Sequence, residues 1–247
     1  MKAKKILNYR RFNGTLSNIS YKREINVKGY HRMNGIKIVY RGGEGEIVEK
    51  KSRFIATVCP VDSEEDAVGF IEKIKKKYWD ARHNCHAFVV GERNEISRCS
   101  DDGEPSGTAG KPMLDVLLGA GLHNVCVVVT RYFGGTLLGT GGLVRAYSQA
   151  VQEGLANSLI VEKIMSCRMK IYTDYNGIGK IQYILGKSRA ITVNTEYTER
   201  VVVEILIENG YTDQLCKEIV EATSGKAGIE KIGECYCAVA DGEVIVF

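Results

Sequence analysis

The stretch that decides the fold of the first half of the chain is NVCVVVTRYFGGTLLGTGGLVRAYSQAV, residues 124–151. Its first third is apolar at consecutive positions, which is typical of a strand buried on both faces of a sheet. The glycine-rich segment TRYFGGTLLGTGG (130–142) comes next, and after it apolar residues recur at helical spacing. The stretch therefore predicts a buried strand, a glycine loop and a helix, in that order.

A second glycine-rich stretch lies upstream, SDDGEPSGTAGKP (100–112). Pro112 closes it and suits the first position of a helix, where its missing N–H leaves no hydrogen bond unmade. The segment PMLDVLLGAGL (112–122) keeps the helical period and stops at Gly121. Both glycine loops are thus expected to touch the N-terminus of a helix.

Further upstream, the pattern is that of a sheet with one helix. Residues 46–61 are typical of one or two strands, and residues 83–100 of two strands around a turn. Residues 62–79 have the helical period, with Asp62 or Ser63 as the expected N-cap.

The pattern changes near Cys167. From there the expected elements follow the order β-α-β-β-α-β, which is the ferredoxin-like plan. We therefore predict an α+β protein with three parts. These are a basic N-terminal extension (1–42), a first domain (43–165) and a ferredoxin-like second domain (166–247).

Charge is unevenly distributed along the chain. Residues 1–37 carry 10 of the 34 basic residues and one of the 30 acidic residues. The remaining 24 basic and 29 acidic residues give the rest of the chain a net charge of −5. A basic tail is able to bind nucleic acid electrostatically. Translation starting at Met33 would remove most of it, so the extension is either a disordered tail or a start-site artefact.

Composition excludes several classes of protein. The apolar runs are about five residues long, whereas a membrane helix needs roughly 20, and no secretory signal is visible at the N-terminus. The eight cysteines include no CxxC pair, which argues against a zinc finger. We expect a cytoplasmic protein with reduced thiols, no cofactor and no membrane partner.

The two glycine loops predict a site for an anion such as a phosphate. A helix N-terminus presents unpaired N–H groups and about half a positive charge, and glycines let a ligand approach the backbone closely. The candidates are the basic residues and glycines around the two helix starts: Lys51, Arg53, Gly107, Gly110, Lys111, Arg131, Gly134, Gly135, Gly141, Gly142 and Arg145. Replacing Arg131 and Lys111 by alanine is expected to weaken anion binding without unfolding the protein. The alternative is that the loops are only tight turns.

The acids of the first loop have two interpretations. Asp101, Asp102 and Glu104 are weak candidates for holding Mg²⁺ beside a phosphate, or they cap the turn through their carboxylates. We favour capping, because metal sites usually gather ligands from distant segments. His83 and His86 lack the two further ligands that zinc requires. No metal site is therefore predicted, and the catalytic residues, if any, stay unknown.

These motifs resemble the signature of the IMPACT/YigZ family in its bacterial two-domain form. Besides the two loops, the segments VEKKSRFIA (48–56) and DARHNCHAF (80–88) match its pattern. The resemblance runs from about Gly43 to the C-terminus. His86 departs from it, because the family pattern has an aromatic residue there.

The resemblance implies an N-terminal domain similar to domain 2 of ribosomal protein S5 and a C-terminal domain similar to the last domain of elongation factor G. It implies no established catalytic residues. We therefore predict a non-enzymatic regulator of translation that binds RNA or the ribosome. The alternatives are a Mg²⁺-dependent enzyme or binding protein for a phosphorylated small molecule, and an interaction module with purely structural loops.

Overall fold

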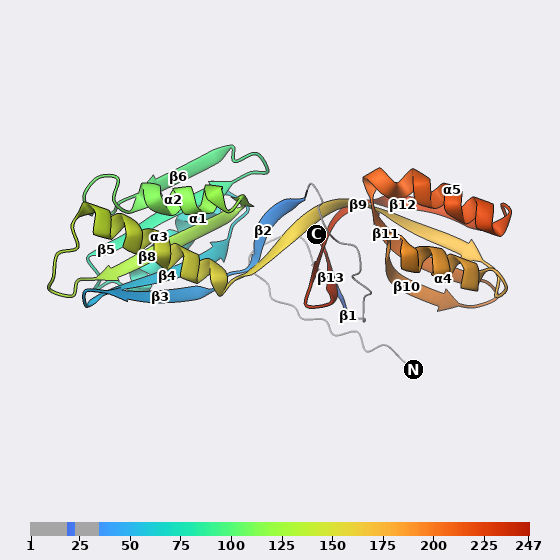
Figure 1. Ribbon diagram of the computed structural model, residues 1–247, viewed down its shortest axis with the longest axis horizontal. Helices are drawn as coiled ribbons and strands as arrows, with labels where there is room; N and C mark the ends of the chain where they lie inside the picture. The colour runs from blue at the N-terminus through green and yellow to red at the C-terminus, as the bar shows by residue number, and fades with distance from the viewer. Residues whose placement is uncertain (1–18, 23–34) are drawn as a thin grey trace. The chain divides into compact units, whose positions relative to one another are not determined.

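The computed structural model describes residues 19–22 and 35–247 and divides the chain into two compact units (Figure 1). The N-terminal unit is Ile36–Val161. The C-terminal unit is Glu162–Phe247 together with strand β1 (Ile19–Lys22). Each unit combines helices with a sheet, so the predicted α+β class is confirmed.

A five-stranded antiparallel sheet lies at the centre of the N-terminal unit, in the order β3-β4-β8-β5-β6. Its strands are β3 (Glu44–Glu49), β4 (Ser52–Pro60), β8 (Val125–Tyr132), β5 (His83–Val90) and β6 (Ile96–Ser100). Every residue of β8 except Tyr132 is buried, as its continuous apolar run predicts.

Helices cover both faces of this sheet. They are α1 (Glu64–Lys77), α2 (Gly110–Gly119) and α3 (Thr140–Ala156). Ile74 of α1 shares a core with Val128 on one face, while Leu117 of α2 and Tyr147 of α3 share a core with Val127 on the other. Successive strand residues face opposite sides, which is why one strand supplies both cores. Ser63 caps α1 by accepting the N–H of Asp66, as the sequence predicts.

The N-terminal unit begins earlier than the sequence suggests. Residues Ile36–Arg41 were assigned to the extension, but they form strand β2, which pairs in parallel with β7 (Leu122–His123). The side chain of Val39 is buried in the same core as α2 and α3. The signal was missed because β7 is only two residues long and lies far along the chain. The predicted disorder and the start at Met33 fall outside the described residues.

The C-terminal unit has the strand order of a ferredoxin-like domain. Its elements are β9 (Leu159–Thr173), α4 (Ile178–Lys187), β10 (Ile191–Tyr197), β11 (Val201–Glu208), α5 (Thr212–Thr223), β12 (Gly228–Ala240) and β13 (Glu243–Val246). The sheet runs β12-β9-β11-β10 with all neighbours antiparallel, as in the split β-α-β plan. Helices α4 and α5 share a core with one face of the sheet through Ile181 and Ile219. The chain passes from one unit to the other within β9, between Val161 and Glu162.

Candidate functional site

The N-terminus of α2 is occupied by a carboxylate of the chain itself. Asp101 accepts the N–H groups of Ala109 (2.9 Å) and Gly110 (2.8 Å) on Oδ1 and that of Gly107 (2.8 Å) on Oδ2. Burial acts to raise the pKa of Asp101, but these three backbone donors outweigh it and hold the pKa below its ordinary value. Asp101 therefore takes the place that an external phosphate would occupy at this helix.

Asp102 fixes the same loop to the sheet and to α1. Its carboxylate accepts the N–H of Asn84 (2.7 Å) and pairs with Lys75 Nζ (2.6 Å). Burial acts to raise the pKa of Asp102, and the contacts with Lys75 and Asn84 overcome that effect and lower it. The carbonyl oxygen of Asp102 also lies 2.9 Å from Nδ1 of His83.

Glu104 is the centre of a buried polar network. Its Oε1 accepts from Arg131 Nη1 (2.5 Å) and from the Tyr147 hydroxyl (2.9 Å). The Cys85 sulfur lies 3.0 Å from the carbonyl oxygen of Asp101 and 3.3 Å from Tyr147 Oη, so its single S–H has two acceptors within reach. Burial raises the pKa of Cys85 to about 12, so the thiol stays protonated at neutral pH. The three acids of this loop are thus committed to contacts within the chain.

The candidate cations have different surroundings. Arg131 is buried and paired with Glu104, so it is a structural residue and is not exposed to a ligand. Arg53 forms a bidentate pair with Glu46, and Lys111 pairs with Asp115 one helical turn away. Lys51 and Arg145 are exposed, and neither forms an ion pair with any residue that the structure describes.

The N-terminus of α3 differs from that of α2. It begins after Gly139 (φ +74°), and within residues 19–22 and 35–247 no side chain caps its first turn. Thr140 and Gly141 are exposed, and a Cβ added to Gly141 would meet no atom within 4 Å. Among the described helix starts with glycine loops, this is therefore the one that is open to an anion.

The loop before α3 lies directly on the turn before β4. A Cβ added to Gly134 would lie 2.0 Å from the backbone carbon of Lys51, and the Gly134 N–H donates to Ser52 Oγ at 3.1 Å. The C-terminal end of α3 lies over the opposite end of these strands, where a Cβ on Gly45 would meet the backbone nitrogen of Gly154 at 2.5 Å. The start of α3 therefore lies at the same end of the sheet as Lys51.

We call this region the loop end of the N-terminal unit; it comprises residues 50–53, 78–83 and 131–145. Antiparallel pairing brings the three segments together, because Tyr132 lies opposite Arg53 and Arg131 lies opposite His83. Figure 1 shows this region at the far left, where β8 ends and α3 begins. Of the sequence candidates, the structure gathers Lys51, Arg53, Arg131, Gly134, Gly135, Gly141, Gly142 and Arg145 there. Gly107, Gly110 and Lys111 belong to the α2 start, which Asp101 caps.

Sequence reasoning missed several residues of the loop end. Lys50 and Arg82 are exposed cations, and Trp79 and Phe133 are exposed aromatic residues. They lie outside the glycine motifs and on separate segments, so no local pattern connects them. The one available signal was Trp79 itself, the only tryptophan of the chain, directly after a lysine-rich helix end.

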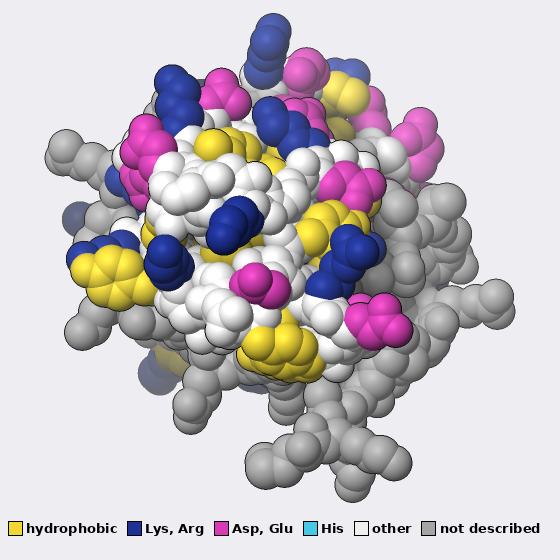
Figure 2. Space-filling view, turned by 90° about the vertical axis from the view of Figure 1, so that its right-hand side faces the viewer, with side chains coloured by type: hydrophobic (Ala, Val, Ile, Leu, Met, Phe, Trp, Pro, Cys, Tyr) yellow, Lys and Arg dark blue, Asp and Glu magenta, His cyan; other side chains and the backbone are white. Residues whose placement is uncertain are grey.

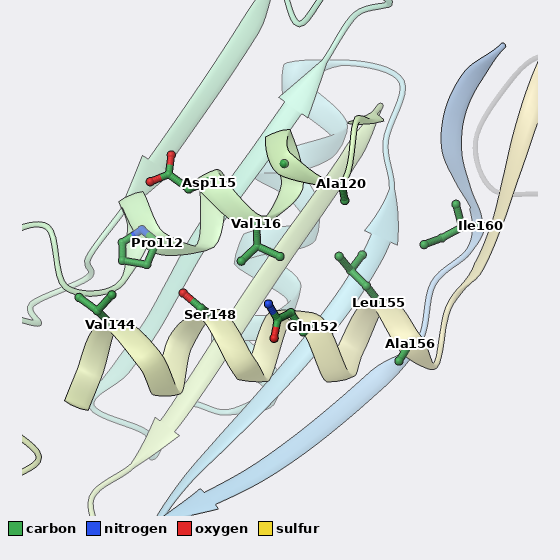
Figure 3. Close-up of a pocket in the computed structure, with 11 residues that line it drawn as sticks. Pro112, Asp115, Val116, Ala120, Val144, Ser148, Gln152, Leu155, Ala156 and Ile160 are labelled. Atoms are coloured by element: carbon green, nitrogen blue, oxygen red, sulfur yellow. The ribbon is translucent and has the colours of Figure 1, made fainter. Parts of the chain in front are cut away.

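Two other surfaces do not share these features. A groove of about 770 Å³ runs between α2 and α3 (Figure 3). Its lining is mostly apolar, with Asp115, Ser148 and Gln152 as polar members and no cation. Seen from the end of the C-terminal unit at the right of Figure 1, Lys and Arg side chains are interspersed with Asp, Glu and hydrophobic ones (Figure 2).

Comparisons with known proteins match both units. Residues 50–155 match the Impact N-terminal domain, and residues 171–226 match a domain of unknown function (DUF1949). The chain is 46% identical over 193 residues to the IMPACT family member YvyE of Bacillus subtilis, covering 78% of this chain and 89% of that one. It is 35% identical over 187 residues to the IMPACT family member YigZ of Escherichia coli, covering 75% and 92%.

One solved structure is similar to this chain in fold and sequence. The crystal structure of a hypothetical protein matches with a TM-score of 0.52 and 32% identity, covering 81% of this chain and 98% of the other. Within the described ranges, no helix is both long and apolar enough to cross a membrane.

Proposed function

The chain belongs to the IMPACT family, and from that premise we propose that it is a non-enzymatic, cytoplasmic regulator of translation that binds RNA or the ribosome through the loop end of its N-terminal unit. The observation that carries this proposal is the open N-terminus of α3 beside the exposed cations Lys51 and Arg145. Uncapped N–H groups and the helix dipole favour an anion at this position, and glycines allow its oxygens to come close.

The exposed cations of the loop end are spread over several segments, which favours a polyanion as the ligand over a single phosphate group. Lys50 and Lys51 precede β4, Arg82 precedes β5, and Arg145 lies in the second turn of α3. A single phosphate group contacts only a few of these positions, whereas a nucleic-acid backbone presents one charge after another. The chain outside residues 1–37 is net acidic, so binding depends on this local cluster and not on overall charge.

The Mg²⁺-dependent alternative receives no support from the acidic loop. A divalent site needs carboxylate oxygens that are free to coordinate, and Asp101, Asp102 and Glu104 each accept hydrogen bonds from protein donors. A phosphorylated small molecule bound without metal remains a competing ligand, and the binding experiment includes it.

The test is co-sedimentation of the full chain with ribosomes and with purified ribosomal RNA, at low and high salt. The test variant is Lys51→Ala with Arg145→Ala, and the matched control is Lys217→Ala with Arg200→Ala, two exposed cations of the C-terminal unit. We expect salt-sensitive pelleting that the test variant weakens and the control retains. Since all proteins keep the basic residues 1–37, their contribution cancels in the comparison. Equal pelleting of the two variants would refute the proposed site. Binding abolished by a nucleotide, added with and without Mg²⁺, would favour the small-molecule ligand.

A further inference from the structure

Two aromatic side chains at the loop end project into solvent. Trp79 is 82% exposed, and Phe133 is 51% exposed. Large aromatic residues usually bury most of their surface, and they are enriched where a protein meets a partner. Neither residue is needed for the two cores of the sheet, which are formed by other side chains.

The two aromatic residues are linked through Tyr132. Its hydroxyl donates to Asp80 Oδ1 at 2.8 Å, which ties the residue after Trp79 to the residue before Phe133. The ring of Tyr132 also lies 5.9 Å from the guanidinium of Arg53, and the Arg131 guanidinium lies 5.7 Å from the ring of Phe133. Trp79 and Phe133 therefore lie on segments that meet at the loop end, although 54 positions separate them in the sequence.

Cations without partners border this surface. Lys50, Lys51 and Arg82 are exposed, and none pairs with a carboxylate in the described part of the chain. Arg53 and Lys75, nearby, are already neutralised by Glu46 and Asp102. Positive charge that is left uncompensated around aromatic faces complements a phosphate backbone with accessible bases.

The turn that carries two of these cations is conformationally unusual. Lys50 and Lys51 join β3 to β4 with φ of +45° and +67°. Two-residue hairpin turns with both φ positive favour Asn-Gly or Gly-Gly, since a side chain is disfavoured in this region. Lysines at both positions point to a role of their charges outside the fold.

We propose that the loop end binds single-stranded nucleic acid in preference to a duplex, with unpaired bases stacking on Trp79 and Phe133 and phosphates contacting Lys50, Lys51 and Arg82. This inference rests on the proposed function and specifies the form of the nucleic acid. In a duplex the bases are stacked on each other and their faces are closed to side chains, whereas a single strand offers them. Of the two forms of nucleic acid, only the single strand therefore offers base faces to the exposed rings.

The experiment uses the full chain and an RNA of about 12 nucleotides, a length within the site sizes of single-strand binders. Fluorescence anisotropy of labelled RNA measures affinity for the single strand and for the matching duplex. Emission of Trp79, the only tryptophan in the chain, reports stacking directly with unlabelled RNA. The variants are Trp79→Ala, Trp79→Phe and Phe133→Ala, with Tyr183→Ala, an exposed aromatic residue of the C-terminal unit, as control.

We expect tighter binding of the single strand, quenching of Trp79 on saturation, and a loss of affinity on the order of 5- to 100-fold in Trp79→Ala. Trp79→Phe retains most of the affinity because it keeps a ring, and Tyr183→Ala is unchanged. Thermal unfolding of each variant checks that the exposed positions do not affect the fold.

Three results would overturn the inference. Equal affinity for strand and duplex with unchanged Trp79 emission would leave the proposed function standing and remove the stacking surface. Absence of binding to either RNA at low salt, together with no ribosome pelleting, would remove both proposals. Ribosome pelleting that depends on Trp79 without any binding of free RNA would assign the surface to a ribosomal protein instead.

Discussion

Arg131 and Glu104 form an ion pair inside the N-terminal unit, with Nη1 2.5 Å from Oε1 and side chains only 7% and 3% exposed. The pair joins the acidic glycine loop to the end of β8, and the Tyr147 hydroxyl completes the coordination of the same oxygen. Arg131 is therefore held inside the unit by Glu104. Its burial argues against the expectation that alanine could replace it without consequence for folding.

Removing one partner of this pair should be strongly destabilising. In Arg131→Ala the Glu104 carboxylate loses its countercharge in a buried position, and such changes cost about 3–5 kcal/mol. Urea unfolding of Arg131→Ala, Glu104→Ala and the double variant measures the coupling, and the double variant should lose less than the sum of the single ones. Additive losses, or single losses well under about 1 kcal/mol, would show that the pair is not coupled as the structure indicates.

Acid should loosen the α2 start through Asp101 and Asp102. The folded protein lowers the pKa of both carboxyls. Their stabilising contribution is therefore present above the unfolded pKa of roughly 4, and it is lost as pH falls through the lower folded value. The melting temperature should drop below about pH 4, and less steeply in Asp101→Asn, which is less stable at neutral pH by about 1–2 kcal/mol. If the melting temperature of Asp101→Asn fell with pH as steeply as that of the wild type, Asp101 would not be the group responsible.

The Lys50–Lys51 turn allows stability and binding to be separated. Lys50→Asn with Lys51→Gly installs the residues that a turn with two positive φ values favours. We expect the free energy of unfolding to rise by about 1 kcal/mol. RNA affinity should fall, and the slope of log K against log salt concentration should become shallower by roughly 0.7 per lost phosphate contact. A variant that is more stable but binds RNA as tightly as the wild type would show that these lysines do not contact it.

Two glycines of the same loop should respond in opposite ways. Gly134→Ala places a Cβ against the Lys51 backbone, so it should displace the loop and weaken both stability and binding. Gly141→Ala meets open space in a helix, so it should be neutral or stabilising by up to about 1 kcal/mol and yet reduce the approach of an anion to the first turn of α3. Gly119→Ala, also open and helical but on α2, is the control. Unchanged RNA affinity in Gly141→Ala would argue against the α3 start as the contact.

Local sequence patterns predicted most of the helices and strands, but they did not predict which distant segments pair or pack together. The helix that Ser63 caps and the strand that ends at Tyr132 were predictable, because periodicity and capping depend on residues a few positions apart. Strand β2 was not predictable, since its pairing with β7 joins segments more than 80 positions apart. The same holds for the candidate site. A local pattern reveals the two glycine loops, but it does not reveal which side chains, if any, accept hydrogen bonds from each helix start.

The sequence by itself determined the α+β class, the order of the strands and helices other than β1, β2 and β7, and the two glycine loops that lead into α2 and α3. Only the tertiary structure decided that Asp101 fills the first helix start, that the second is open, and that Arg131 is buried against Glu104. It also brought Trp79 and Phe133 to one end of the sheet, through the pairing of His83 with Arg131. The physical reason is that secondary structure follows from neighbouring residues, whereas the contacts of a side chain follow from strand register and packing between distant segments.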